Sequence, residues 1–417
     1  MLLSETVSKW FIILCTILAV SAGLHADTKP PVCTDLFVSK EAGGDHDYRS
    51  FRLPTAVVTD KGSVLVFVEA RPGGSDLAHQ DIVMRRSADG GRSWEPMRIV
   101  AEHGDHHVMT GAAVQDRETG RIFLHYRYDP AKLGMSALKA GKLETGSEGK
   151  WVDRQFVIHS DDDGLSWSEP RDSTAAVKPP RAERGGASPS CGIQLRRGPH
   201  KGRLVIPYHW QWNWAQHGSD DGTTEMRGCA IYSDDHGKTW QRGKLTPKPD
   251  AMLTGVAEPQ MVELTDGRIL MNGRNQSLRD KRNVIWRGKG RRLISTSEDG
   301  GETWSLLEAH PTLPGYKQQA AMARYTDPLD GYKSRLLHAS MHDHSRVYLS
   351  YDEGKTWPVY RELPESSIKE CCLVTLPDMS IGLVCLTPDR KIMTFRRFTL
   401  EWLTEGRDTL DRDNPTE

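Results

Sequence analysis

The 417-residue sequence carries almost no net charge, has no cysteines at C-x-x-C spacing, and contains a single long apolar run. Its 55 basic side chains are balanced by 56 acidic ones. No overall electrostatic field therefore favours nucleic acid or an anionic membrane as a partner. Any anion must be recognised by a local group of cations.

The apolar run Trp10–Ala22 follows Lys9 and is followed by small residues ending at Ala26. It is shorter than the roughly 20 apolar residues that span a bilayer. The pattern predicts a secretory signal peptide over residues 1–26, cut after Ala22 or Ala26, although an N-terminal anchor helix is the alternative. We expect a secreted or periplasmic protein with no membrane attachment after cleavage.

Of the seven cysteines, all but Cys15 follow that segment. Six cysteines allow fifteen pairings, and a chain of this length can build a core without them, so disulfides and buried free thiols both stay open. No group of ligands has the spacing of a zinc site. We expect neither a metal nor an organic cofactor.

One octapeptide pattern, S-x-D-x-G-x-[ST]-W, occurs five times. The copies are Ser87–Trp94, Ser160–Trp167, Ser233–Trp240, Ser297–Trp304 and Ser350–Trp357. The Asp side chain can accept from backbone N–H groups of its own turn, the Gly allows a positive φ, and the Trp covers the apolar side of the hairpin. Each copy therefore predicts a stapled turn between two strands.

The spacing of these turns predicts an all-β fold. Successive aspartates lie 53 to 73 residues apart, which suits four short strands with their loops. The intervening text supplies β-branched runs such as Thr55–Val58 and Ser63–Glu69. Five such units and one without the pattern predict a six-bladed β-propeller of four-stranded antiparallel blades over residues 27–404. We expect a monomer, and a disordered charged tail over residues 405–417.

The segment Phe51-Arg52-Leu53-Pro54, followed by the five turns, resembles the sialidase (neuraminidase) superfamily, and the resemblance extends over roughly residues 45–403. Members are six-bladed propellers that carry these turns, called Asp boxes, on the rim away from the active site. The resemblance therefore implies that the box aspartates are structural.

Other segments resemble the parts of that family that carry its chemistry. Glu69-Ala70-Arg71 with Asp76 resembles the segment of the acid/base aspartate, and we expect Arg71 to bind substrate. Ala257-Glu258-Pro259 and Asn272-Gly273-Arg274 resemble the strand pair with the catalytic glutamate and the second arginine. Ser345-Arg346 resembles the third arginine.

These residues suggest a site for an acidic sugar. Guanidinium forks bind a carboxylate bidentately, so Arg52, Arg274 and Arg346 would hold the acid if the fold brings them together. Asp76 would protonate the departing glycosidic oxygen and then activate water.

The sequence departs from the family where a Tyr nucleophile is implied. Glu370 stands there, with no Tyr within nine residues on either side. A carboxylate would be repelled by an anomeric carbon that bears a carboxylate, whereas a neutral phenol would not. Glu370 could therefore act on a different anionic sugar, activate a water for sialosides, or mark a site without turnover. A shifted alignment would leave Tyr325 or Tyr360 for the role.

The predicted function is an exo-acting glycoside hydrolase of the sialidase type that releases a terminal sialic acid or related acidic sugar from glycans. Asp76, Glu258 and Glu370 are the catalytic candidates. The alternative is a carbohydrate-binding propeller without turnover. The aromatic stretch from Tyr208 to Trp214 could stack on sugars or pack under a loop.

Overall fold

The computed structural model describes residues 29–43, 46–73, 79–104, 106–130, 144–212, 225–247, 255–275, 291–314, 318–341, 344–363 and 367–412. The predicted signal peptide and Asp76 lie outside these ranges.

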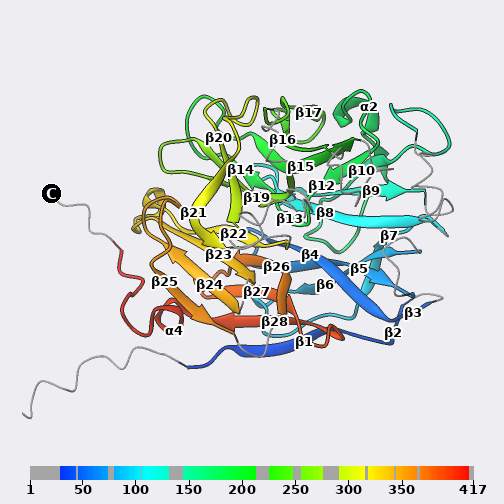
Figure 1. Ribbon diagram of the computed structural model, residues 1–417. Coiled ribbons are helices and arrows are strands. Elements are labelled where there is room, and N and C mark those ends of the chain that lie inside the picture. Colours follow the sequence, from blue (N-terminus) through cyan, green and yellow to red (C-terminus); the bar gives the residue numbers. More distant parts are fainter. Residues whose placement is uncertain are drawn as a thin grey trace, which may run out of the picture.

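Six small sheets follow one another along the chain and around a central axis, as the colours of Figure 1 show. Blade 1 contains β4 (Ser50–Val58), β5 (Val64–Arg71), β6 (Asp81–Ser87) and β7 (Arg98–Ala101). Blade 2 contains β8 (His107–Gln115), β9 (Ile122–Asp129), β10 (Arg154–Ser160) and β11 (Arg171–Asp172). Blade 4 contains β18 (Val256–Glu263), β19 (Ile269–Asn275), β20 (Arg291–Ser297) and β21 (Glu308–Pro314). Blade 5 contains β22 (Ala321–Thr326), β23 (Arg335–Met341), β24 (Ser345–Ser350) and β25 (Val359–Glu362).

Blade 3 differs because its innermost strand is divided into three pieces. These are β12 (Arg184–Ala187), β13 (Ser190–Cys191) and β14 (Ile193–Gln194), and the blade continues with β15 (Leu204–Trp212), β16 (Glu225–Ser233) and β17 (Gln241–Arg242). The middle piece, β13, pairs in parallel with β8 of blade 2 and also contacts β4 and β18. Residues of β13 therefore lie where the inner strands of several blades meet.

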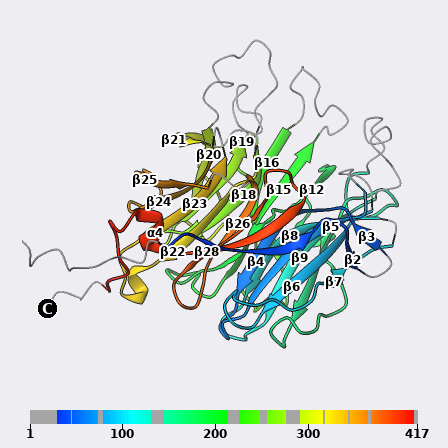
Figure 2. The same ribbon diagram turned by 90° about the horizontal axis from the view of Figure 1, so that it is seen from below.

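Blade 6 closes the ring by using both ends of the folded chain. It contains β26 (Ser367–Thr375), β27 (Ile381–Leu386) and β28 (Ile392–Phe398), and its outer strand is the N-terminal β1 (Val32–Val38). Figures 1 and 2 both show blue β1 along red β28, and their antiparallel register runs from Val32 opposite Arg397 to Val38 opposite Ile392. This pairing satisfies the free edge of the last blade.

The five Asp boxes have the same hydrogen bonds. In each box the Gly N–H donates to the Ser hydroxyl at 2.8–3.0 Å. The Asp carboxylate accepts at 2.8–2.9 Å from the backbone N–H of the residue before the Trp. In the second box the Ser166 hydroxyl and backbone hold the pKa of Asp162 near 2, although burial acts in the opposite direction. The boxes are turns stapled by an ionised aspartate, as predicted.

The box tryptophans also join neighbouring blades. Trp94 of blade 1 packs edge-on against Phe395 of blade 6, and Trp167 of blade 2 packs in the same way against Phe67 of blade 1. Ring centroids in these pairs lie 5.0 Å and 5.5 Å apart. The sequence predicted a cover for the local hairpin, and the structure shows contacts that hold successive blades together.

The remaining elements are short. They are β2 (Glu41–Gly43), β3 (His46–Tyr48), α2 (Thr174–Val177), the 3-10 turn η3 (Pro328–Asp330) and α4 (Leu400–Thr404). None of the helices in the described ranges has the length and apolar content to cross a membrane. The first part of the predicted tail, up to Arg412, is described, and its buried Asp408 pairs with Arg335 of blade 5. The predicted six-bladed all-β propeller is confirmed.

Candidate active site

The two rims of the ring differ in chemistry. Neighbouring strands in a blade are antiparallel, so the first strand starts on the rim where the second strand ends. Each Asp box begins at the last residue of a third strand, which places all five boxes on the opposite rim. The starts of the first strands and the ends of the second strands carry the predicted site residues Arg52, Arg71, Glu258, Arg274 and Glu370.

Arg52 and Glu370 form the first ion pair of this rim. Arg52, on β4 of blade 1, donates from Nε to both carboxylate oxygens of Glu370, on β26 of blade 6, at 2.6 Å and 2.7 Å. Its Nη2 donates to the same carboxylate. The backbone N–H of Leu53 adds a fourth hydrogen bond to Glu370, at 3.0 Å. Glu370 of blade 6 is thus held by four hydrogen bonds from blade 1.

Glu258 and Arg274 form the second pair, within blade 4. Arg274 Nη1 donates to Glu258 Oε2 at 2.9 Å. The two side chains come from adjacent strands, where Ala257 lies opposite Arg274. About a quarter of the Arg274 side chain remains exposed (26%), so solvent and a ligand can reach this pair.

Both pairs depend on an irregular strand start. The register of β4 shifts between Arg52 and Thr55, and that of β18 shifts between Ala257 and Gln260. Within these bulges Leu53 has φ 50° and Glu258 has φ 45°, a left-handed conformation that non-glycine residues rarely adopt. Bulges redirect side chains and occur next to active sites. Here one bulge presents a backbone N–H and the other a carboxylate to the rim.

Arg71 was predicted to bind substrate. In the structure it pairs with a carboxylate of its own strand. It is buried and donates to Glu69 Oε2 from Nη2 at 2.5 Å and from Nε at 3.2 Å. Burial raises the pKa of Glu69, and the Arg71 guanidinium opposes that shift. Arg52 and Glu370 are close enough to influence Glu69 as well. Arg71 is therefore engaged with Glu69, which lies opposite Arg52 in the strand register.

A group of buried charges that the sequence did not reveal lies in blades 2 and 3. Arg184 forms an ion pair with Asp129 at 2.6 Å, and Arg127 lies beside Asp129 and Asp153. Burial lowers the pKa of His107 to about 3, so this ring is neutral among the charges. The alternation in His125-Tyr-Arg-Tyr-Asp129 at the end of β9 was the available signal, because alternate residues of a strand share one face.

Blade 4 contributes one more buried cation that was missed. Arg292, on β20, donates from Nε to the Asn272 side chain at 2.8 Å and from Nη1 to the Gln318 carbonyl at 2.7 Å. Burial lowers its pKa to about 9, while Glu258 acts in the opposite direction. The charges of Glu258 and Arg274 thus act on Arg292 as well.

Arg346 does not join either ion pair. It lies on β24, the third strand of blade 5, and donates to Glu362 of the outer strand from Nε at 3.0 Å and from Nη2 at 2.7 Å. Its guanidinium also lies over the Tyr360 ring, 4.7 Å from the centroid. Arg346 thus lies at the start of a third strand, on the same rim as Arg52, and is engaged with the outer strand of its own blade.

The tyrosines considered as substitutes for Glu370 lie elsewhere. Tyr325 is buried and donates to the Met379 carbonyl at 2.7 Å, on the box side of the ring. Tyr360 lies on the outer strand of blade 5. In the aromatic stretch of blade 3, Trp210 is fully buried and packs on Tyr208, so it cannot stack on a sugar.

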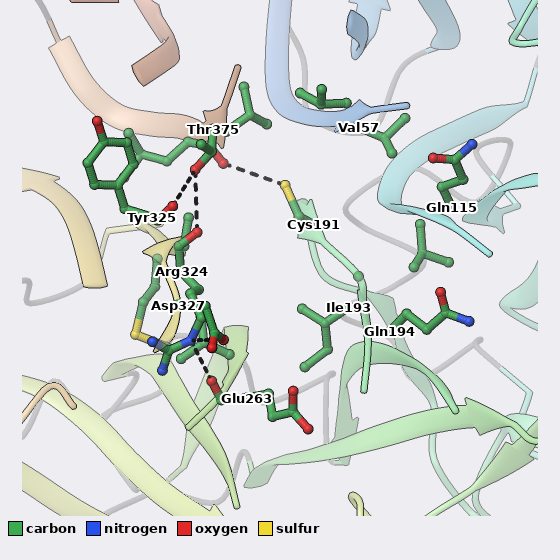
Figure 3. A pocket seen from close by; sticks show the side chains of 18 of the residues that line it. Val57, Gln115, Cys191, Ile193, Gln194, Glu263, Arg324, Tyr325, Asp327 and Thr375 are labelled. Carbon is green, nitrogen blue, oxygen red and sulfur yellow. Dashed lines mark hydrogen bonds and ion pairs between the residues drawn. The ribbon is translucent and has the colours of Figure 1, made fainter. Parts of the chain in front are cut away.

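A cavity of about 400 Å³ lies at the box end of the ring, away from the two ion pairs. The last residues of the inner strands surround it, together with the segment from Cys191 to Gln194 (Figure 3). Its walls are largely aliphatic, and Arg324, Glu263 and Asp327 lie on one side, as Figure 3 shows. Among the described residues no cluster of three or more His, Cys, Asp or Glu side chains has the arrangement of a metal site.

Comparisons with a family model and with curated proteins both find relatives of this chain. The BNR repeat-like domain family matches residues 62–371. A sialidase of Micromonospora viridifaciens is 30% identical over 390 residues, which cover 90% of this chain and 55% of that protein. Human sialidase-4 is 30% identical over 234 residues, covering 52% of this chain and 44% of that protein. The chain thus spans about half the length of these curated relatives.

Solved structures share the architecture. The Hadza microbial sialidase Hz136 aligns with a TM-score of 0.71 and 25% identity, covering 88% of this chain and 69% of that one. The intramolecular trans-sialidase of Ruminococcus gnavus aligns with a TM-score of 0.70 and 20% identity, covering 89% of this chain and 99% of that one. The second likeness concerns the fold alone.

Proposed function

From the premise that this chain belongs to the BNR repeat-like domain family and the sialidase superfamily, we propose that it is an exo-acting glycoside hydrolase. Its substrate would be a glycan that ends in an acidic sugar, sialic acid or a related one. The observation that carries this proposal is the presence of two Arg–Glu pairs, Arg52–Glu370 and Arg274–Glu258, on the rim opposite the Asp boxes.

The arginines would bind the acid of the sugar. Arg52 and Arg274 are each partly exposed, with 24% and 26% of their side chains accessible. Guanidinium groups form strong, bidentate hydrogen bonds to carboxylates. A substrate carboxylate that reaches Arg52 has to share it with Glu370 or displace it. Binding of the acid would therefore loosen Glu370 at the moment when the sugar arrives.

The displaced Glu370 would then act as a general base. A carboxylate freed from Arg52 can take a proton from a water positioned at the anomeric carbon. Asp76, in the segment between β5 and β6, would donate the proton to the leaving oxygen, and Glu258 would remain on Arg274 beside the anomeric face. Direct attack by this water would invert the configuration of the released sugar.

A second candidate follows from the chemistry of Glu370. A carboxylate can be a nucleophile toward an anionic sugar whose anomeric carbon carries hydrogen, as in a uronic acid glycoside, because no carboxylate shields that carbon. Glu370 would then form a glycosyl–enzyme intermediate, and the sugar would be released with retained configuration.

The test is hydrolysis of a fluorogenic sialoside and of matched uronic acid glycosides by the purified chain. Proton NMR of the first sugar released then distinguishes inversion from retention. Release from either substrate supports the hydrolase, and the stereochemistry selects between the two roles of Glu370. Binding of the free acidic sugars without release from any glycoside would overturn the hydrolase proposal in favour of a carbohydrate-binding propeller.

A further inference from the structure

Two thiols from opposite parts of the ring lie in contact. Cys191 Sγ on β13 is 3.4 Å from Cys372 Sγ on β26. These residues are 181 positions apart in the sequence. A disulfide would bring the two sulfur atoms to about 2.05 Å.

We propose that Cys191 and Cys372 form an oxidisable pair that takes a disulfide across the centre of the propeller. The pair is a modification site, and its oxidation does not depend on the proposed hydrolase activity. Its oxidant is a low-molecular-weight disulfide that enters through the cavity on the box side.

The cavity gives one of the two thiols access. Cys191 lines it, and Figure 3 shows its sulfur among the lining side chains. Cys372 is buried, with 2% of the residue exposed. The two positions define an order of events, because an external reagent reaches Cys191 first and Cys372 only through Cys191.

The surroundings suit Cys191 as the attacking group. The hydrogen bond with Cys372 holds the pKa of Cys191 below its ordinary value, although burial acts in the opposite direction. The hydrogen bond with Cys191, and burial after it, raise the pKa of Cys372. The thiolate is the nucleophile in disulfide exchange, so the accessible member of the pair is also the more reactive one.

The exchange takes place in two steps. The Cys191 thiolate attacks one sulfur of the external disulfide, which forms a mixed disulfide and releases one external thiol. The Cys372 thiolate then attacks Cys191 Sγ and releases the second external thiol. The pair loses two protons and two electrons, and the external disulfide is reduced to two thiols.

The resulting bond would join two inner strands, β13 and β26, on the box side of the candidate active site. Cys372 lies two residues from Glu370 on β26. The Cys191 thiol contacts the Ala56 carbonyl, at 3.1 Å, on the strand that carries Arg52. A cross-link between such distant positions restricts the unfolded chain strongly, which stabilises the folded ring.

The experiment uses the full chain with Cys33→Ser, because Cys33 is exposed and would react independently. The reduced protein is incubated with bis(2-hydroxyethyl) disulfide, unreacted thiols are blocked under denaturing conditions, and the peptides are analysed by mass spectrometry. We expect a peptide pair joined through Cys191 and Cys372, and a melting temperature about 5 °C above that of the reduced protein.

Two matched variants test whether Cys191 is one of the two cysteines that form the disulfide. Cys191→Ser should abolish both the joined peptides and the rise in melting temperature, whereas Cys229→Ser, at a buried thiol of blade 3, should keep both. If a variant fails to fold, the joined peptides and the melting temperatures of the oxidised and reduced parent still test whether the disulfide forms. A mixed disulfide that persists on Cys191, or two thiols that stay free after prolonged exposure to the reagent, would overturn the proposal.

Discussion

Arg52 and Glu370 join the first and last blades of the propeller through three hydrogen bonds between one guanidinium and one carboxylate. The pair is 318 positions apart in the sequence and meets only because the ring closes. It places a carboxylate where the family resemblance implies a tyrosine, and it partly neutralises the arginine expected to hold the substrate acid. Under the proposed function, a substrate acid that binds Arg52 would have to compete with the protein's own carboxylate.

The first prediction concerns that carboxylate. Glu370→Gln keeps a hydrogen-bond acceptor for Arg52 and Leu53 but removes the base, so kcat should fall by about 10²- to 10⁴-fold. The measurement is steady-state hydrolysis of whichever acidic glycoside the parent cleaves. Glu362→Gln is the matched control, because Glu362 also pairs with an arginine but lies on an outer strand. Its kcat should stay within about threefold of the parent, by the small effect of most surface ion pairs. If the Glu370→Gln variant keeps the parental kcat, Glu370 is a structural partner of Arg52 and not a base.

The second prediction distinguishes the role of Arg274 from that of Arg346. Arg274→Met removes a charge-assisted contact to the substrate acid, worth about 1.5–3 kcal/mol, so KM should rise about 10- to 100-fold. Arg346→Met should change KM by less than about threefold, because Arg346 is engaged with Glu362 on the outer strand. The comparison is made from the KM of both variants at one pH. Equal increases in KM would mean that Arg346 leaves Glu362 and reaches the substrate.

The propeller was predictable because its signal is local and repeated. An Asp box contains its whole network of hydrogen bonds within eight residues, so the sequence shows both the turn and its spacing. The pairing of Glu258 with Arg274 was also within reach, since both lie in short segments that resemble family motifs. The contact between Arg52 and Glu370 required the closure of the ring by β1 and β28.

The directions of the side chains explain why the contacts of Arg346 and the group of buried charges were not predicted. Arg346 belongs to a recognisable motif, but its partner Glu362 lies on the next strand. The residues that a strand side chain contacts on neighbouring strands cannot be predicted from its own segment of sequence. The buried group of Arg127, Asp129 and Arg184 draws on two blades. Each of these residues looks like an ordinary surface charge in a sequence that is rich in charges.

The third prediction tests the structural role of the boxes. Asp162→Ala removes the acceptor for the Ser166 backbone and hydroxyl, at 2.8 Å and 2.5 Å, and should destabilise the protein by about 1–3 kcal/mol. Asp161→Ala is the adjacent control, because its ion pair with Arg121 is exposed and contributes at most about 1 kcal/mol. Urea unfolding followed by tryptophan fluorescence measures both. Equal midpoints for Asp162→Ala and the parent would contradict the stapling role.

The last prediction concerns Asp408, which follows α4 and ties the end of the folded chain to blade 5. Its carboxylate accepts from Arg335 Nε at 2.8 Å and from the Tyr351 hydroxyl at 2.8 Å, and Lys333 lies 2.7 Å away. Burial alone would raise the pKa of Asp408, but these donors lower it to about 2. Arg335 is fully buried, so Asp408→Asn would leave its charge without a counter-ion.

We expect Asp408→Asn to lower the free energy of unfolding by about 3–5 kcal/mol at pH 7, as in other buried pairs that lose one partner. The folded pKa of Asp408 lies below its unfolded value of about 3.9, so its contribution is complete above that value and is lost as the pH falls toward 2. The difference between parent and variant should therefore shrink between about pH 5 and pH 2. Urea unfolding across that range measures it, with the exposed Asp411→Asn as the control, which should match the parent throughout. A difference that stays constant with pH would show that packing around Asp408, and not its charge, fastens the end of the chain.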